Sequence, residues 1–399
     1  MKQIIFVESS PTDMLMKIAL TLRKRGYNPI LISLIGKDNI QFTKKAYSKR
    51  IFLGFNFVKI NFKNIPLITY YSLKNSLNLI KATISILKLK PYVVIGRANP
   101  NWLCVIAKFI FKKYPFIYFP YDIRSFVYKD YEEAINSGVP EFEIKSERYC
   151  FQNVDGIMHK GHEEELTWLD EKVLGEKIKI TCPVINIRPY CLPEFTVPIN
   201  SNKLSKRDRE INFVNVGVIS NHDSYINSIN AIINQKIHFH IYGKIANLTE
   251  SRTYKILHDD KYKNIINNKY FHMHPQVEQE KLTKEISQYD YGFWPGWYDT
   301  ETKNNWTATG NKLSSFLEAG LPFFYFDNHK AIDNLMKKYN LDLKISFDEI
   351  KTMKKRLEAL NYKELIKNVE KARKDLDIMK NIPKLEKFFE EVREFKYNV

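Results

Sequence analysis

The sequence of 399 residues contains few cysteines and none of them forms a Cys-x-x-Cys pair. The cysteines stand singly, at Cys104, Cys150, Cys182 and Cys191. This usage argues against a disulfide scaffold and against a thiolate zinc site, and it fits a reducing cytoplasm.

Several common signature motifs are also absent. The turn after the first predicted strand, residues 8–13, lacks Gly-x-Gly-x-x-Gly, and neither a phosphate-binding P-loop nor a Gly-x-Ser-x-Gly elbow occurs. The His162-Glu163 pair begins like a zinc-protease helix, but Leu166 stands where the second histidine is required. The sequence therefore predicts no NAD-type site, no P-loop NTPase, no metal and no bound cofactor.

Long apolar runs are missing too. The longest, residues 102–111, is broken by Lys108, and about 18 apolar residues are needed to span a membrane. The first residues resemble a β-strand more than a signal peptide. We expect a cytoplasmic protein that is either soluble or peripheral on the inner face of the membrane.

Positive charge, in contrast, is abundant and unevenly placed. The chain has 62 basic and 45 acidic residues, a formal charge of +17. Residues 1–113 hold 20 of the basic and only 3 of the acidic side chains, so the remainder of the chain is balanced. The whole excess lies in the first part of the chain, which predicts that this part meets a negative surface.

Short apolar strands alternate with amphipathic helical stretches in both halves of the sequence. This rhythm predicts an α/β protein with two Rossmann-like parallel-sheet lobes that face a cleft. We expect an N-terminal acceptor-binding domain at 1–190, a proline-rich linker at 191–210, a C-terminal nucleotide-binding domain at 211–375 and a helical segment at 376–399.

The most informative segment spans residues 289–326. A strand is followed by a polar loop of small residues, by Gly310-Asn311-Lys312 at the start of a helix, and by Ala319-Gly320-Leu321-Pro322 before the next strand. A helix that begins at the carboxyl edge of a parallel sheet directs free N–H groups and the positive end of its dipole toward a ligand. The segment therefore either binds a diphosphate or only caps the helix.

Residues 311–322 resemble the Asn-Lys-Leu…Ala-Gly-Leu-Pro segment of GT-B glycosyltransferases, and Val214 to Gly217 resembles the glycine-bearing strand that opens their second lobe. The resemblance implies the GT-B fold, a UDP- or GDP-sugar as co-substrate and a donor site in the second lobe. The implied donor-binding residues are Gly217, Lys244, His274, Val277, Thr309, Gly310, Asn311, Lys312, Ser315 and Glu318.

Ser315 stands where this family commonly places a ribose-binding glutamate. Glu318 lies nearly one helical turn further and either replaces that glutamate or is a surface residue. His272 and His274 alternate on a predicted strand, and we expect one to face the core and the other to face outward. Trp294, with a second tryptophan three residues later, either stacks on a sugar or base or fills space beneath the loop.

In the first lobe, polar residues follow three predicted strands and should meet at one sheet edge. Asp122 is the preferred group to deprotonate or orient an acceptor hydroxyl, and Glu8 competes with it. Arg124 either serves the acceptor or locks Asp122 in an ion pair. The candidate acceptor-binding residues are Ser9, Ser10, Arg97, Asn99 and Arg124.

These features together predict a glycosyltransferase of the hexosyltransferase class that acts on an anionic or lipid-linked glycan or polymer in cell-envelope polysaccharide biosynthesis. The alternatives are a sugar-nucleotide epimerase of the same fold and a basic nucleic-acid-binding protein. The second is disfavoured because no RNA- or DNA-binding signature occurs. Donor sugar, acceptor and stereochemical outcome do not follow from the sequence.

Overall fold

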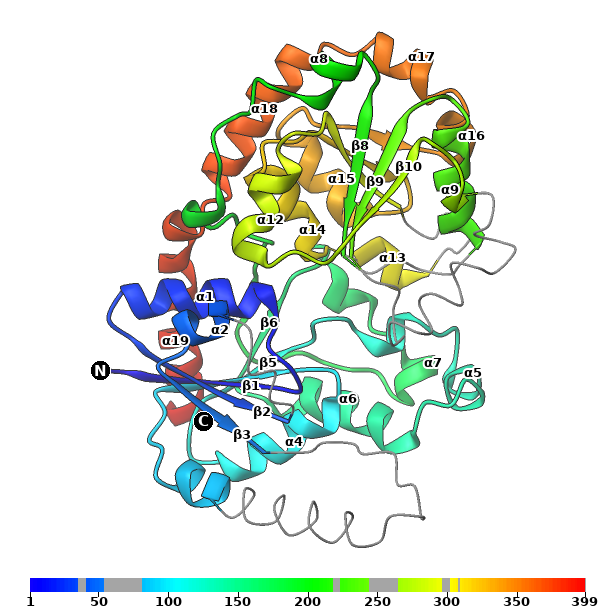
Figure 1. Ribbon diagram of the computed structural model, residues 1–399. Coiled ribbons are helices and arrows are strands. Elements are labelled where there is room, and N and C mark those ends of the chain that lie inside the picture. The colour runs from blue at the N-terminus through cyan, green and yellow to red at the C-terminus, as the bar shows by residue number, and fades with distance from the viewer. Residues whose placement is uncertain are drawn as a thin grey trace, which may run out of the picture. The chain divides into compact units, whose positions relative to one another are not determined.

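The computed structural model describes residues 1–34, 41–53, 81–217, 223–243, 265–295, 302–307 and 309–398. The chain forms two compact units (Figure 1). The first unit comprises residues 1–160, 166–187 and 381–399, and the second comprises residues 161–165 and 188–380.

The first unit is built on a seven-stranded sheet with the order β3-β2-β1-β4-β5-β6-β7, in which every neighbouring pair is parallel. Its strands are β1 (Gln3–Glu8), β2 (Asn28–Ser33), β3 (Lys49–Phe52), β4 (Val93–Arg97), β5 (Phe116–Phe119), β6 (Gly156–His159) and β7 (Val184–Asn186). The central strands β4, β5 and β6 are buried along their whole length. Continuous apolar runs of this kind are typical of parallel sheets covered on both faces.

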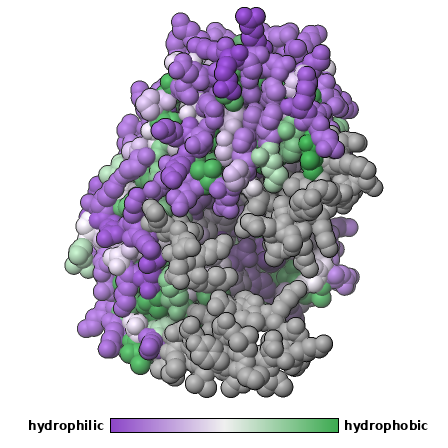
Figure 2. Space-filling model, viewed as in Figure 1, coloured by the Kyte–Doolittle hydropathy of each residue, from purple (hydrophilic) through white to green (hydrophobic). Residues whose placement is uncertain are grey.

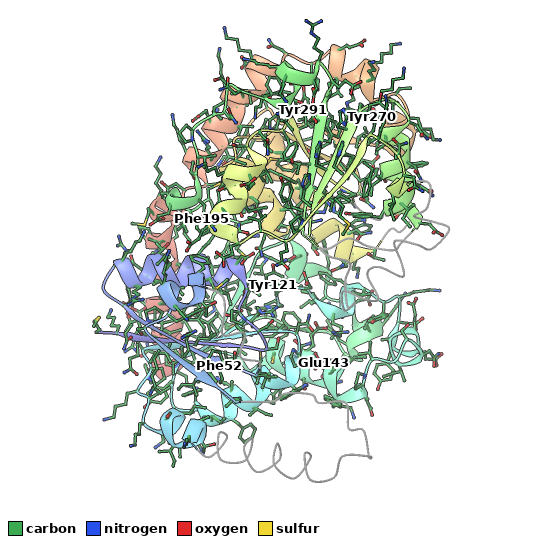
Figure 3. The ribbon with its side chains drawn as sticks, in the orientation of Figure 1. Phe52, Tyr121, Glu143, Phe195, Tyr270 and Tyr291 are labelled. Atoms are coloured by element: carbon green, nitrogen blue, oxygen red, sulfur yellow. The ribbon has the colours of Figure 1, made fainter. Side chains whose placement is uncertain are left out.

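Helices connect these strands. They are α1 (Asp13–Lys24), α2 (Gln41–Ala46), α4 (Asn101–Ile110), α5 (Tyr131–Asn136), α6 (Glu141–Asn153) and α7 (Glu171–Leu174), with 3₁₀ turns η1 (Arg124–Phe126) and η2 (Glu165–Trp168). Glu143 of α6 accepts hydrogen bonds from the N–H groups of Asn101 and Trp102, at 2.7 and 3.3 Å, and so caps α4 (Figure 3).

The C-terminal helix α19 (Ile378–Asn398) packs on the first unit, beside β1 (Figure 1). Arg25 and Glu386 form two hydrogen bonds of 2.7 Å, and Lys2 pairs with Glu390 at 3.0 Å. Val392 lies so close to β6 that a Cβ atom at Gly156 would stand 2.5 Å from it. The end of the chain thus completes the unit that contains its beginning.

The second unit contains a six-stranded parallel sheet with the order β10-β9-β8-β11-β12-β13. Its strands are β8 (Asn212–Val216), β9 (His238–Tyr242), β10 (Phe271–His274), β11 (Tyr291–Trp294), β12 (Phe323–Phe326) and β13 (Lys344–Ile345). Phe213 of β8 stacks on Phe293 and Phe324 of the two strands beyond it, at 6.0 and 5.6 Å between ring centroids. Aromatic packing therefore forms much of this core.

The helices of the second unit are α8 (Leu204–Asp208), α9 (Asp223–Ile233), α12 (Gln279–Ile286), α13 (Lys303–Thr307), α14 (Asn311–Glu318), α15 (Lys330–Lys337), α16 (Phe347–Ile350), α17 (Met353–Glu358) and α18 (Tyr362–Asp375), with the 3₁₀ turn η3 (Pro193–Phe195). The outer faces of α8, α17 and α18 are hydrophilic (Figure 2). This agrees with the lysine-rich sequence of α17 and α18.

The predicted α/β class with two parallel sheets is confirmed. The segment expected to be a linker, residues 191–210, lies on the second unit: the Val197 N–H donates to the Glu318 carbonyl at 3.0 Å, and Arg373 donates to the Val197 carbonyl at 2.8 Å. Within the described part of the chain, none of the helices is both long enough and apolar enough to cross a bilayer.

Candidate functional site

The carboxyl edge of the second sheet carries two glycine turns that lie against each other. Gly217 follows β8 with a φ of +99°, and its N–H donates to the Tyr242 carbonyl at 2.8 Å. A Cβ atom at Gly243, which follows β9, would stand 1.8 Å from the Gly217 carbonyl oxygen. Only glycine permits this close approach. Because Gly217 and Gly243 carry no side chains, a ligand can approach the backbone at this edge.

Helix α14 begins at the same edge. Its N-cap residue, Gly310, has an extended conformation and no side chain with which to cap the helix. The ring of Trp294, at the end of β11, packs against Gly310 so that a Cβ atom there would stand 3.0 Å from it. No described side chain therefore caps the start of α14, where N–H groups commonly bind phosphate, although the Leu313 N–H already donates to the Gly310 carbonyl at 3.2 Å.

Lys312 lies in the first turn of α14 and supplies a full positive charge. Its Nζ donates to Asn215 Oδ1 at 3.2 Å and lies 5.9 Å from the centre of the Trp294 ring. Among the residues that the structure describes, Lys312 forms no ion pair with a carboxylate. Burial lowers its pKa to about 8. Lys312 is partly exposed, and desolvation of an ammonium without a counter-charge still costs free energy, which an anionic ligand would reduce.

Ser315 and Glu318, the two candidates for binding ribose, differ in their surroundings. Glu318 is fully buried, and its Oε1 accepts a hydrogen bond from the Leu192 N–H at 2.7 Å. Ser315 donates to the Asn311 carbonyl at 3.1 Å and accepts from Gln279 Nε2 at 3.2 Å. Glu318 thus holds the chain at Leu192, while Ser315 and Gln279 form a polar pair between α14 and α12.

Trp294 is 8 % exposed and lies between two polar groups. Besides Lys312, its ring faces His329 at 5.6 Å between centroids. His329 follows β12, and its Nδ1 lies 3.1 Å from the Asn305 carbonyl, while its buried Nε2 has no hydrogen-bond partner among the residues that the structure describes. Burial lowers the pKa of His329 to about 4, so it is neutral at pH 7. Trp294 therefore fills space beneath the start of α14.

His272 and His274 lie on the same face of the sheet, so the expectation of opposite faces is wrong. The His240 ring stacks on both, at 4.3 Å from His272 and 5.3 Å from His274. The reason is the two-residue period of a strand, which places residues i and i+2 on one face.

In the first unit, the predicted residues meet at the carboxyl edge of the sheet. Ser9 Oγ donates to the Asn99 carbonyl at 2.8 Å, and Arg124 lies within 3.5 Å of Asn99 Oδ1. The Arg124 N–H donates to Glu147 of α6 at 2.6 Å, which positions this loop. The strand order brings these loops together because β1, β4 and β5 are neighbours.

Glu8 and Asp122, the two candidate bases, have opposite environments. Glu8 is fully buried; it accepts from the Thr12 N–H at 3.1 Å and pairs with Arg97 at 3.3 Å. Burial raises the pKa of Glu8 to about 7, against the opposing effect of Arg97. Asp122 is exposed, and its carboxylate pairs with Lys160 at 3.2 Å rather than with Arg124.

Lys160 follows β6 and contacts both Asp122 and Tyr121 at this edge of the sheet. Its Nζ lies 3.7 Å from the centre of the Tyr121 ring, and Arg97 lies 5.1 Å from the same ring (Figure 3). Tyr121 thus sits between two cations, next to Asp122. The edge combines one exposed carboxylate with a concentration of positive charge, which suits an anionic hydroxyl-bearing ligand.

The sequence matches no protein-family model and no curated protein sequence. The structure, however, is similar to solved ones along nearly the whole chain. Sucrose-phosphate synthase of Thermosynechococcus elongatus superposes with a TM-score of 0.69 over 97 % of this chain and 98 % of that chain, at 12 % identity. The chain has the GT-B fold.

Two further structures support the GT-B fold. The HepE protein of Anabaena in complex with UDP gives a TM-score of 0.63, with 12 % identity over 97 % of this chain and 99 % of that chain. A glycosyltransferase of Rickettsia africae gives 0.57, with 11 % identity over 98 % and 99 %. The predicted fold class is thereby confirmed.

In this GT-B chain the structure brings together one group of the predicted donor residues: Gly217, Thr309, Gly310, Asn311, Lys312 and Ser315. Thr309 is buried beside Gly310. Val277 packs on the apolar core, and His274 belongs to the stacked histidines. Lys244 lies outside the described residues. The roles of all of these residues as ligand contacts stay predictions.

Four residues near the two candidate sites were not singled out from the sequence as site residues: Asn215, Gln279, His329 and Lys160. Asn215 lies inside a strand, where polar residues are uncommon, and it also contacts the Tyr225 hydroxyl. An asparagine inside an otherwise apolar strand, as at Asn215, is the one signal in the sequence that could have indicated a functional side chain. The other three are recognised only by their neighbours in space.

Proposed function

We propose that the protein is a glycosyltransferase that uses a nucleoside-diphosphate sugar and transfers the sugar to an anionic or lipid-linked glycan or polymer. The observation that carries this proposal is Lys312, a partly exposed lysine at the start of α14 whose pKa is lowered by desolvation and which has no described carboxylate partner. The diphosphate supplies the negative charge that this position lacks.

During the reaction, charge accumulates on the leaving nucleoside diphosphate. The N–H groups at the start of α14 and the Lys312 ammonium stabilise that charge without having to reorganise. Asn215 holds Lys312 in place through the 3.2 Å hydrogen bond. Gly217 keeps the backbone beside Lys312 free of a side chain, since a Cβ atom there would stand 3.4 Å from Lys312 Cε.

Uridine is the favoured base of the donor. HepE was solved with UDP, and TcCGT1, which superposes with a TM-score of 0.53 at 12 % identity, was also solved with UDP. GDP remains the alternative. Ser315 and Gln279 are the groups proposed to contact the ribose in place of the usual glutamate.

Asp122 is the proposed base that orients or deprotonates the acceptor hydroxyl. Its exposure allows a substrate to reach it, whereas the buried Glu8 holds Arg97 and the loop at Thr12. Lys160 and Arg124 are the cations proposed to face an anionic acceptor, since the charge of the buried Arg97 is already paired with Glu8.

The first unit also has features that support action at the inner membrane face. Residues Ile106, Phe109 and Ile110 of α4 are exposed, and Lys112 and Lys113 follow directly. Apolar side chains beside lysines suit a bilayer with anionic headgroups. Sedimentation with acidic liposomes at low salt is expected for the wild type; no sedimentation, with normal transfer to a soluble acceptor, would refute membrane action.

The donor is identified by a thermal-shift screen with UDP, GDP, CMP and dTDP and their sugars. A ligand that binds only the folded state stabilises it by about 2.7 kcal/mol at 100 times its Kd, so the true donor should raise the Tm clearly. Product analysis with and without an acceptor then separates transfer from epimerisation. No Tm rise with any nucleotide would contradict the proposed function.

A further inference from the structure

Four histidines form a continuous row across two neighbouring strands of the second unit, and we refer to them as the histidine ladder: His238, His240, His272 and His274. The first two lie on β9 and the last two on β10. In the parallel register His272 pairs with His240. Strand β10 is the edge strand of its sheet, so the ladder lies at a sheet edge (Figure 3, beside Tyr270).

The ladder is held by acceptors behind two of its members. His238 Nε2 lies 2.5 Å from the Glu210 carboxylate, and His240 Nε2 lies 3.0 Å from Asn212 Oδ1. Asn212 Nδ2 donates to the Glu210 backbone carbonyl at 2.8 Å, which leaves the Asn212 side-chain oxygen for His240. Since both partners accept, both Nε2 atoms carry the proton. The Nδ1 atoms of His238 and His240 therefore carry lone pairs, which accept hydrogen bonds from the other two histidines.

These lone pairs point toward the other two histidines. His238 Nδ1 lies 2.8 Å from His272 Nε2, and His240 Nδ1 lies 3.0 Å from His274 Nε2. Neutral imidazole is the form in which histidine binds a metal.

We propose that His238, His240 and His272 bind one Zn²⁺ ion. Each offers one ring nitrogen, and these three nitrogens lie within 4.8 Å of one another. Tetrahedral zinc with Zn–N bonds of about 2.0–2.1 Å needs ligand nitrogens about 3.3 Å apart. Imidazole nitrogens suit zinc, whereas Mg²⁺ and Ca²⁺ prefer oxygen.

The surroundings of the three nitrogens suit this ion. Glu210 behind His238 is the carboxylate that metal-binding histidines commonly have on their second nitrogen, and Asn212 serves His240 in the same way. The His240 and His272 rings stack at 4.3 Å and 16°, so one ring turns about its side-chain bonds when zinc binds. A water molecule takes the fourth position.

The proposal is independent of the glycosyltransferase function. Zinc would tie the edge strand β10 to β9 and to the segment that carries Glu210. Because the ligands come from two strands, the ion binds the folded state only, and the Tm should rise with the zinc concentration.

The test uses the full chain without a polyhistidine tag, stripped with EDTA and titrated with ZnCl₂ in a calorimeter. One equivalent should bind with saturation, Mg²⁺ should not bind, and Co²⁺ should give the visible absorption of a tetrahedral site. His272→Ala should weaken zinc binding at least 100-fold. His162→Ala, which removes a histidine outside the ladder, should bind zinc as the wild type does.

His272 is half-buried, so the Tm of His272→Ala without zinc should lie close to that of the wild type. Glu210→Gln, which retains an acceptor oxygen, should weaken zinc binding about 10-fold. Absence of saturable zinc binding to the wild type, or equal affinities of the wild type and His272→Ala, would overturn the proposal.

Discussion

Lys312 Nζ lies 3.2 Å from Asn215 Oδ1, and this hydrogen bond joins the first turn of α14 to the interior of strand β8. An amide oxygen satisfies one proton of the ammonium but leaves its charge uncompensated. Lys108 of the first unit, in contrast, pairs with the Asp155 carboxylate at 2.5 Å. The contrast between these two lysines supports the proposal that Lys312 meets an anionic ligand.

Replacement of Lys312 by alanine should lower kcat at least 100-fold, because removal of one preorganised donor to developing charge costs about 10²–10³ in rate. The Tm should stay within about 2 °C of the wild type, since no described ion pair is lost. Steady-state kinetics and a thermal melt measure the two effects. Lys281→Ala, at an exposed position of α12, is the matched control; near-normal turnover of Lys312→Ala would contradict the role in phosphate binding.

The affinity for UDP should fall between pH 7 and pH 9. The pKa of Lys312 is about 8 in the free protein, so the protonated fraction decreases from about nine-tenths to about one-tenth across this range. Only the protonated form attracts the diphosphate, so affinity decreases as pH rises. Calorimetry at pH 7 and at pH 9 measures the affinity for UDP. In Lys312→Arg the charge persists, and the pH dependence should become flat; an equally steep decrease in that variant would assign it to another group.

Gly243→Ala should destabilise the second unit by about 1–3 kcal/mol and weaken nucleotide binding, because the added Cβ would stand 1.8 Å from the Gly217 carbonyl oxygen. Urea denaturation measures the loss. Gly26→Ala is the control: its φ is +86° but no atom lies within 4 Å of the new Cβ. That variant should lose only about 1 kcal/mol for the backbone conformation and leave nucleotide binding intact.

Glu318→Ala should lower the free energy of unfolding by about 1–3 kcal/mol, because the buried Leu192 N–H loses its acceptor. Glu318→Gln retains an oxygen that can accept this bond and should lose less. If Glu318 instead bound the ribose, Glu318→Gln would retain its Tm and lose affinity for UDP. Parallel urea titrations and UDP binding curves decide between these two roles.

Asp122→Asn should lower kcat about 10²–10⁴-fold with little change in Tm, since the side chain is exposed and a positioned base contributes about that much. Glu8→Gln should mainly change stability. The pKa of Glu8 is raised from 4.5 to about 7 in the fold, so the folded state binds the proton more tightly, and this group makes the protein less stable as pH rises from 4.5 to 7. In Glu8→Gln that part of the pH dependence should vanish.

Sequence reasoning was most successful where structure depends on neighbours along the chain. The predicted start of the helix near Asn311 and the predicted strand at the beginning of segment 289–326 agree with α14 and β11, because helix starts and apolar strands are encoded by a few consecutive residues. The convergence of Ser9, Asn99 and Arg124 was also predictable. In a parallel sheet all carboxyl ends lie at one edge, so strand order alone brings their loops together.

Contacts between distant segments were not predictable in the same way. Glu318 and Leu192 are 126 positions apart, and no local pattern indicates that one binds the other. Likewise, the composition of helix α19 is compatible with packing on either unit. Its ion pairs with Arg25 and Lys2 show that it packs on the first unit.

By itself the sequence determined the α/β class, the two parallel sheets and the concentration of positive charge in residues 1–113, because all three depend on periodicity and composition. Only the tertiary structure decided that Lys312 contacts Asn215 without a described carboxylate partner and that four histidines stack in one row. Burial and cross-strand register are properties of the packed sheet. They set the charge state and the partners of a side chain, and these govern what it can bind.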